Sequence, residues 1–127
     1  MKYTFHSQEP IYVQLAEIIK RKIVRGELEP GVKLPSVRDM AINAGVNPNT
    51  VQRTYRELEG TKIVESKRGQ GTFVTENEKI LHEIREEMKT KEVSRFVRSM
   101  REMGYSEMEM KAGLEAYLAK KWGADYD

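Results

Sequence analysis

The chain has 127 residues, and its 39% hydrophobic and 33% charged content is typical of a folded globular protein and excludes a disordered one. It contains no cysteine, which excludes a disulfide scaffold, a zinc ribbon and a cysteine nucleophile and suits a reducing cytoplasm. No apolar run approaches the roughly 20 residues of a membrane-spanning helix, and the N-terminus lacks the apolar core of a signal peptide, so we expect a cytoplasmic protein.

The net charge of +2 is unevenly distributed along the chain. Residues 1–75 contain 12 Lys and Arg against 8 Asp and Glu, whereas residues 76–127 contain 10 against 12. A basic first part and an acidic second part indicate a nucleic-acid-binding unit joined to a region that binds protein or a small molecule. Solvated helix faces produce the same asymmetry, so the charge pattern is an indication only.

A helix is predicted over residues 10–26. Apolar side chains recur there at spacings of three and four, which places them on one helical face. Pro10 suits the first turn of this helix and Gly26 its end. The apolar face consists of Ile11, Leu15, Ile18, Ile19 and Ile23.

Two further helices are predicted between residues 36 and 59. Ser36 and Asp39 have the form of a capping box, and Gly45 suits the end of that helix. Asn47 is a typical N-cap and Pro48 a typical first helical residue, so the next helix starts almost at once. Two helices joined by a glycine-containing turn are typical of a helix-turn-helix. The residues of the second of these helices that we expect in the core are Val51, Tyr55 and Leu58.

A β-hairpin is predicted next. The β-prone runs 61–66 and 70–75 flank a tip that is rich in glycine and basic residues. Phe73, in the second run, is expected in the core. A helix, a helix-turn-helix and a basic hairpin in this order make a winged helix.

Only helices are predicted in the last part of the chain. A capping box of Thr75 and Glu78 begins a long helix that continues to Gly104, with an irregularity at residues 89–92 where the apolar stripe is interrupted.

A third capping box, Ser106 with Glu109, begins a last short helix. The apolar stripe across residues 80–118 is larger than one pair of helices can bury, and self-association is the simple way to cover it. Five of the seven methionines also lie here. Because methionine adapts to irregular surfaces, a pocket for a small-molecule effector between subunits is an alternative, but we favour dimer packing alone.

The predicted fold class is therefore mostly α with a small β-hairpin. An N-terminal winged helix-turn-helix domain, residues 1–75, is followed by a C-terminal helical dimerisation hairpin, residues 76–127.

Four stretches of the chain, taken in order, resemble the GntR family of bacterial transcription regulators. They are residues 10–15, 34–41, 47–58 and 69–74. The remaining residues, 76–127, are too few for the larger effector domains of some members, and their two predicted helices resemble the short YtrA-like subgroup. This resemblance implies a dimeric repressor, often of a transporter operon.

The third predicted helix is the candidate reader of a DNA major groove, with its N-terminal residues nearest the bases. Asn47, Asn49 and Gln52 carry amides that both donate and accept hydrogen bonds, which suits the edge of adenine. The resemblance implies that Thr50 and Arg53 on the same helix contact the DNA backbone.

The resemblance implies two further groups of DNA-binding residues. Ser36 and Arg38 match positions that contact the DNA backbone. Arg68, Gly69 and Gln70 match a hairpin tip that enters the minor groove. An arginine there suits the strongly negative potential of a narrow groove, and a glycine allows the backbone to approach closely.

Other roles stay open for several of these residues. Ser36 and Asn47 are also N-caps, and the cap limits the freedom of Asn47 to read a base. Arg53 is as well suited to pair with a carboxylate and brace the fold. Pro48 and Asn49 stand early in the reading helix, where many relatives have arginine or threonine, so no operator sequence is carried over from the family.

Catalysis and metal binding have no candidate residues. There is no nucleophile motif, no phosphate-binding glycine loop and no acid–base pair. His6 and His82 lie far apart in the sequence, with no cysteine to complete a soft metal site. We therefore predict no enzyme activity and no cofactor.

The sequence predicts a DNA-binding transcription regulator, a repressor that binds a palindromic operator as a homodimer, with half-sites roughly 34 Å apart. A docking module for another protein is the first alternative, against which the basic hairpin argues. RNA binding is the second, and the chain lacks the exposed aromatic platforms that stack unpaired bases.

Overall fold

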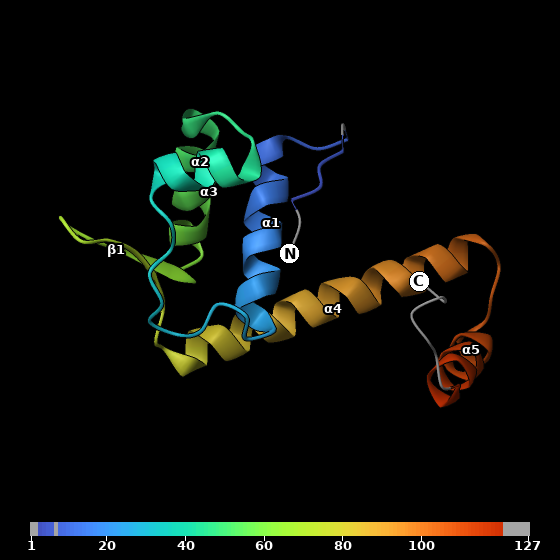
Figure 1. Ribbon diagram of the computed structural model, residues 1–127. Coiled ribbons are helices and arrows are strands. Elements are labelled where there is room, and N and C mark those ends of the chain that lie inside the picture. Colours follow the sequence, from blue (N-terminus) through green and yellow to red (C-terminus); the bar gives the residue numbers. More distant parts are fainter. Residues whose placement is uncertain (1–2, 7, 121–127) are drawn as a thin grey trace. The chain divides into compact units, whose positions relative to one another are not determined.

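The computed structural model describes residues 3–6 and 8–120. The chain divides into two compact units, Met1–Glu86 and Glu87–Asp127. The described residues form five helices and two strands (Figure 1), namely α1 (Ile11–Val24), α2 (Val37–Ala44), α3 (Pro48–Gly60), β1 (Val64–Lys67), β2 (Gly71–Val74), α4 (Glu78–Glu102) and α5 (Glu107–Ala119). The predicted fold class, mostly helical with one small hairpin, is confirmed.

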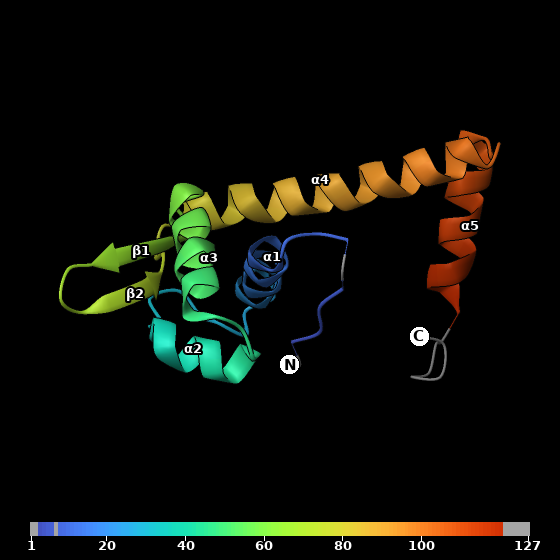
Figure 2. The same ribbon diagram turned by 90° about the horizontal axis from the view of Figure 1, so that it is seen from above.

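The core of the first unit lies between α1 and α3, which pack side by side (Figure 2). Leu15 and Ile19 on α1 and Leu58 on α3 are fully buried, as the spacing of apolar residues predicted. Helix α2 packs against α3 and adds Met40. Side chains from the segments around the hairpin close this core, and the fully buried apolar ones are Leu34, Ile63, Val64 and Val74.

The helix-turn-helix forms because each boundary has the residue that its backbone requires. The Ser36 hydroxyl accepts from the Asp39 N–H at 3.1 Å, which caps α2. Gly45 has φ +69°, the left-handed conformation that ends a helix without a Cβ clash. Asn47 caps α3 and Pro48 is its first residue, as predicted.

The hairpin pairs antiparallel, with Val64 opposite Val74 and Lys67 opposite Gly71. The other edge of β2 pairs with residues 31–34, where the Leu34 N–H donates to the Thr72 carbonyl at 2.8 Å. No strand was predicted in this region, because so short an extended run before a proline shows no alternation of its own.

Two aromatic residues expected in the core differ in their environment. Tyr55 is buried, and its hydroxyl donates to the Pro35 carbonyl at 2.7 Å. Burial raises the pKa of Tyr55, because the charged phenolate is poorly solvated there. Phe73 is only half-buried, and the Lys67 Nζ lies 4.7 Å from the centre of its ring.

The start of α4 differs from the predicted capping box of Thr75 and Glu78. The cap is Asn77, whose Oδ1 accepts from the N–H groups of Lys79 at 3.0 Å and Ile80 at 3.2 Å. The Thr75 hydroxyl instead accepts from the Asn77 N–H and donates to Glu65. The helix begins two residues later than the box required, and Asn77 satisfies its first backbone donors.

Within the second unit, α4 continues as a helix through residues 89–92, where an irregularity was expected. The predicted box at Ser106 is confirmed: its hydroxyl accepts from the Glu109 N–H, and Glu109 accepts from the Ser106 N–H. Among residues 87–120, Met110 is the one buried side chain. No helix in the described part of the chain is long and apolar enough to cross a membrane.

Candidate nucleic-acid interface

Helix α3 divides into a buried face and an exposed polar stripe. The buried residues recur at spacings of one, three and four, and so do the exposed polar residues, so each group lies on one side of the helix and the two sides are opposite. The buried face consists of Val51, Thr54, Tyr55 and Leu58. The polar stripe of α3 consists of Asn49, Gln52, Arg53 and Arg56, all exposed. Arg56 was not among the predicted site residues, although its spacing from Gln52 and Arg53 already indicated this stripe.

The first turn of α3 separates its three predicted amide readers. The Asn47 Oδ1 accepts from the Asn49 N–H at 2.7 Å, so this oxygen is committed to the helix start. Asn49 gives only its backbone N–H to this cap, and Asn49 and Gln52 are both exposed. Thr50 is half-buried, and its N–H donates to the Asn47 carbonyl. Asn49 and Gln52 are therefore the better placed of the amides to read a base edge.

Arg53 is held against the first helix. Its guanidinium carbon lies 3.9 Å from the centre of the Tyr12 ring, and its Nη2 donates to the Tyr12 hydroxyl at 3.2 Å. The partner of Arg53 is thus an aromatic ring, not the carboxylate that the bracing alternative required.

The start of α2 presents Ser36 and Arg38 on the surface of the same unit. Both residues are exposed. The Ser36 oxygen accepts the cap bond, which leaves its hydroxyl hydrogen able to donate elsewhere. Capping and contact with an anion are therefore compatible at this residue.

The hairpin tip is formed by Arg68, Gly69 and Gln70, which are all exposed. The Gln70 N–H donates to the Lys67 carbonyl at 2.8 Å and closes the turn. Gly69 has φ +75°, and a side chain at this position would meet open space. Glycine is therefore favoured here by the backbone conformation and not by crowding.

Lys33 joins the basic hairpin from the segment that pairs with β2. A Cβ built on Gly71 would lie 2.7 Å from the Lys33 Cε, so the lysine chain crosses the strand where glycine leaves room. Lys67 pairs with Gly71 across the hairpin, and Arg68 is the residue after Lys67. The sequence alone did not indicate Lys33, because it lies 38 residues before Gly71 in the chain.

The polar stripe of α3 and the hairpin belong to one compact unit, Met1–Glu86. The Ser66 hydroxyl donates to the Glu59 carboxylate at 2.9 Å and ties β1 to the end of α3. All ten predicted site residues lie in this unit, on or next to α2, α3 and the hairpin tip. In the described part of the chain no group of three or more His, Cys, Asp or Glu side chains lies close enough to hold a metal ion.

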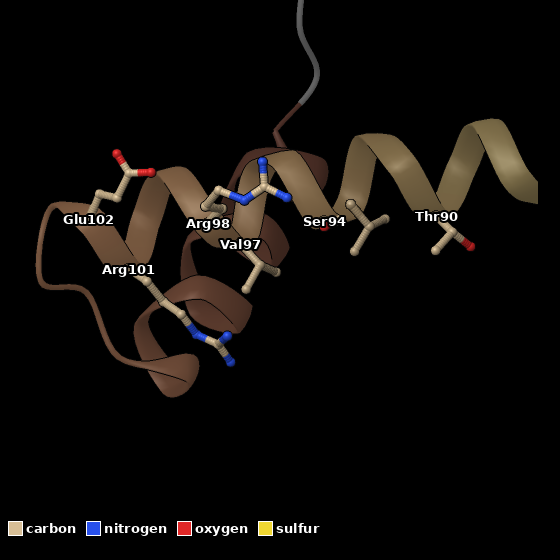
Figure 3. A pocket seen from close by; sticks show the side chains of 7 residues that line it. Thr90, Ser94, Val97, Arg98, Arg101 and Glu102 are labelled. Atoms are coloured by element: carbon tan, nitrogen blue, oxygen red, sulfur yellow. The ribbon is translucent and has the colours of Figure 1, made fainter.

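The second unit contains surface pockets of its own. One pocket of about 550 Å³ lies along α4 between Thr90 and Glu102, where Val97 and Arg101 extend to the same side of the helix (Figure 3). Another, of about 460 Å³, lies between α4 and α5. Its lining is mainly apolar and includes Val93, Phe96, Val97, Met110 and Leu114. We call this second pocket the α4–α5 groove.

A helix-turn-helix with an exposed polar helix, followed by a basic hairpin, defines a winged-helix DNA-binding transcription regulator. Residues 11–74 match the family model described as bacterial regulatory proteins, gntR family. The chain is 47% identical over 117 residues to the HTH-type transcriptional regulator YhcF of Bacillus subtilis, and this match covers 92% of this chain and 97% of YhcF. The chain belongs to the GntR family.

Two further relatives support this assignment. The chain is 47% identical over 73 residues to the HTH-type transcriptional repressor YtrA of Bacillus subtilis, a match that covers 58% of this chain and 56% of YtrA. A solved GntR family transcriptional regulator from Listeria monocytogenes has a TM-score of 0.83 at 34% identity, and the match covers 88% of this chain and 98% of that one. The resemblance to YtrA-like regulators is confirmed, and the protein is a DNA-binding transcription regulator.

Proposed function

We propose that this regulator is a cytoplasmic repressor that binds a palindromic operator as a homodimer and has no catalytic role. The observation that carries the proposal is the polar stripe of α3, exposed beside a basic hairpin on one compact unit. We assign residues 1–75 to DNA binding and residues 76–127 to dimerisation.

Affinity and specificity fall to different residues in this proposal. Arg38 and Ser36 at the start of α2, with Thr50 and Arg53 on α3, bind backbone phosphates, which gives affinity without sequence preference. Base reading falls to Asn49 and Gln52, with Asn47 as a third candidate.

The hairpin tip lies in the neighbouring minor groove in this proposal. Arg68 supplies the charge that a narrow groove attracts, and Gly69 and Gln70 bring the backbone close to its floor.

The homodimer rests on the second unit, which leaves its large apolar side chains exposed. The exposed fraction is 80% for Met108, 70% for Leu118 and 55% for Val93. Two helices that bury one side chain between them have too little core to be stable alone, and a second copy supplies the missing surface. Two-fold symmetry of that dimer matches a palindromic operator.

A small-molecule effector is the second candidate for this region, and the apolar α4–α5 groove favours it. We prefer a second copy of the chain as its cover. A thermal-shift screen of metabolites distinguishes the two. If an effector binds, the melting temperature of the protein rises as the metabolite concentration rises, whereas if a dimer forms, it rises as the protein concentration rises.

The test of DNA binding begins with fragments selected by the protein from its own bacterial genome. Affinity for the best fragment should fall steeply with added salt, because phosphate contacts release counterions. Arg38→Ala should weaken binding to every duplex, whereas Gln52→Ala should change the preference at particular bases. If neither variant altered a mobility-shift titration, the assignment would be wrong.

A further inference from the structure

Arg53 is the member of the polar stripe of α3 that another helix holds in place. Besides the stacking and the hydrogen bond to the Tyr12 side chain, the Thr54 hydroxyl lies 3.2 Å from the Tyr12 carbonyl and 2.9 Å from the Thr50 carbonyl, which share its one hydrogen. Helices α1 and α3 pack on each other around these contacts. The Tyr12 side chain is thus held against Arg53, and its backbone lies against the next residue of α3.

Other arginines of this chain are held by carboxylates. Arg21 pairs with Glu17 at 3.4 Å and Arg95 with Glu92 at 3.3 Å. Within the described residues no carboxylate oxygen lies within 4.0 Å of the Arg53 guanidinium. A carboxylate cancels the charge of its partner, whereas the face of a tyrosine ring attracts a cation and leaves its net charge intact. Arg53 is therefore oriented without being neutralised.

This difference matters for binding a phosphate. A carboxylate partner would compete with the phosphate for the guanidinium, and a ring face does not. Guanidinium has five N–H donors, and the bond to Tyr12 uses one of them. Ordering a long side chain opposes binding, and here much of that ordering already exists in the free protein.

We propose that Tyr12 is a positioning residue for operator binding, which holds the Arg53 guanidinium ready for a backbone phosphate. This proposal rests on the proposed function, since it needs α3 to lie against DNA. It gives α1, predicted from its sequence only as a core helix, a part in recognition.

The chain contains a matched control in the same unit. The Lys22 Nζ donates to the Tyr3 hydroxyl at 2.9 Å and lies 4.4 Å from the centre of that ring. Lys22 is 8% exposed, and a Glu27 carboxylate oxygen lies 3.9 Å from its Nζ. Tyr3 thus makes the same kinds of contact as Tyr12, but to a cation that is buried and paired. Tyr3→Leu should leave DNA affinity unchanged.

The experiment is a double-mutant cycle on the best genomic fragment, read by fluorescence anisotropy of the labelled duplex. Tyr12→Leu should weaken binding about 3-fold to 30-fold, the range expected for a lost cation–π contact and a newly mobile arginine. Arg53→Ala should weaken binding at least as much. The double variant should bind no more weakly than Arg53→Ala alone, because Tyr12 then has no guanidinium to direct.

Additive losses in the double variant, or unchanged binding by Tyr12→Leu, would overturn the proposal. Thermal unfolding of each variant accompanies the titrations. If Tyr12→Leu does not fold, Tyr12→Phe replaces it in the cycle, since it keeps the ring and removes only the hydroxyl. Tyr12→Phe should weaken binding about 2-fold to 5-fold, and this loss should disappear in the Arg53→Ala background.

The two proposals fail in different ways. If Arg38→Ala and Gln52→Ala change DNA binding while Arg53→Ala does not, the role of Tyr12 is wrong and operator binding stands. If none of the three variants changes binding, the proposed function itself is wrong.

Discussion

The two units of this regulator use their apolar residues in opposite ways. Met1–Glu86 buries Leu15, Ile19 and Leu58 completely, so its core is complete within one chain. Residues 87–120 of the second unit bury Met110 and expose most of their other large apolar side chains. The first unit therefore has the core of an independent domain, whereas the second has the exposed apolar surface on which we propose the dimer interface. Four substitutions test this contrast, and the largest expected effect comes first.

A charge placed on the exposed apolar face of α5 should separate the subunits. Leu118→Asp puts a carboxylate where we expect a second copy, and burying an unpaired charge is costly. Because a monomer engages one half-site at a time, operator affinity should fall on the order of 10²-fold to 10⁴-fold. Sedimentation equilibrium and anisotropy measure the two effects, with Glu115→Gln on the same helix as the control. A variant that stays dimeric would contradict the proposed interface.

A cavity in the first unit should reduce stability directly. Leu58 is fully buried, and Leu58→Ala should lower the free energy of unfolding by about 2–5 kcal/mol. Urea denaturation measures the change. Ile42→Ala in the same unit is the matched control, because Ile42 is 69% exposed and its loss should change stability by no more than about 0.5 kcal/mol. Equal losses for both variants would show that the core is not where the structure places it.

Removing the charge at the hairpin tip should change the salt dependence of DNA binding. Arg68→Gln should lower the slope of log affinity against log salt by about one, the value expected when one phosphate charge is no longer neutralised. Lys91→Gln, an exposed lysine of the second unit, should leave the slope unchanged. Anisotropy titrations at several salt concentrations provide both slopes. An unchanged slope for Arg68→Gln would remove the tip from the interface.

Loss of the α5 cap should have the smallest effect. Ser106→Ala removes the hydroxyl that accepts from the Glu109 N–H, at a cost of about 1 kcal/mol. Amide hydrogen exchange at Glu109 should speed up accordingly. Ser106→Asp keeps an acceptor at the cap and should restore protection. If exchange stays slow in Ser106→Ala, the cap does not limit the stability of α5.

Much of the fold and several site residues could be predicted from the sequence because their causes are local. Ser36 and Asn47 cap helices through backbone groups two or three residues away, and Gly45 ends a helix through its own dihedral angles. The basic tip around Arg68 follows from two β-prone runs of short separation. Such interactions are complete within a few residues, so the amino-acid sequence by itself determined them.

Only the tertiary structure decided the contacts between distant segments. At the start of α4 the predicted cap, Thr75, instead donates to Glu65 on β1, and Asn77 caps the helix. Lys33 reached the hairpin through a strand pairing too short to show a period. The partner of Arg53 became Tyr12 because α1 packs on α3, an arrangement of helices that no local spacing expresses. Residues that lie 38 or 41 positions apart in the chain meet only once the core has formed.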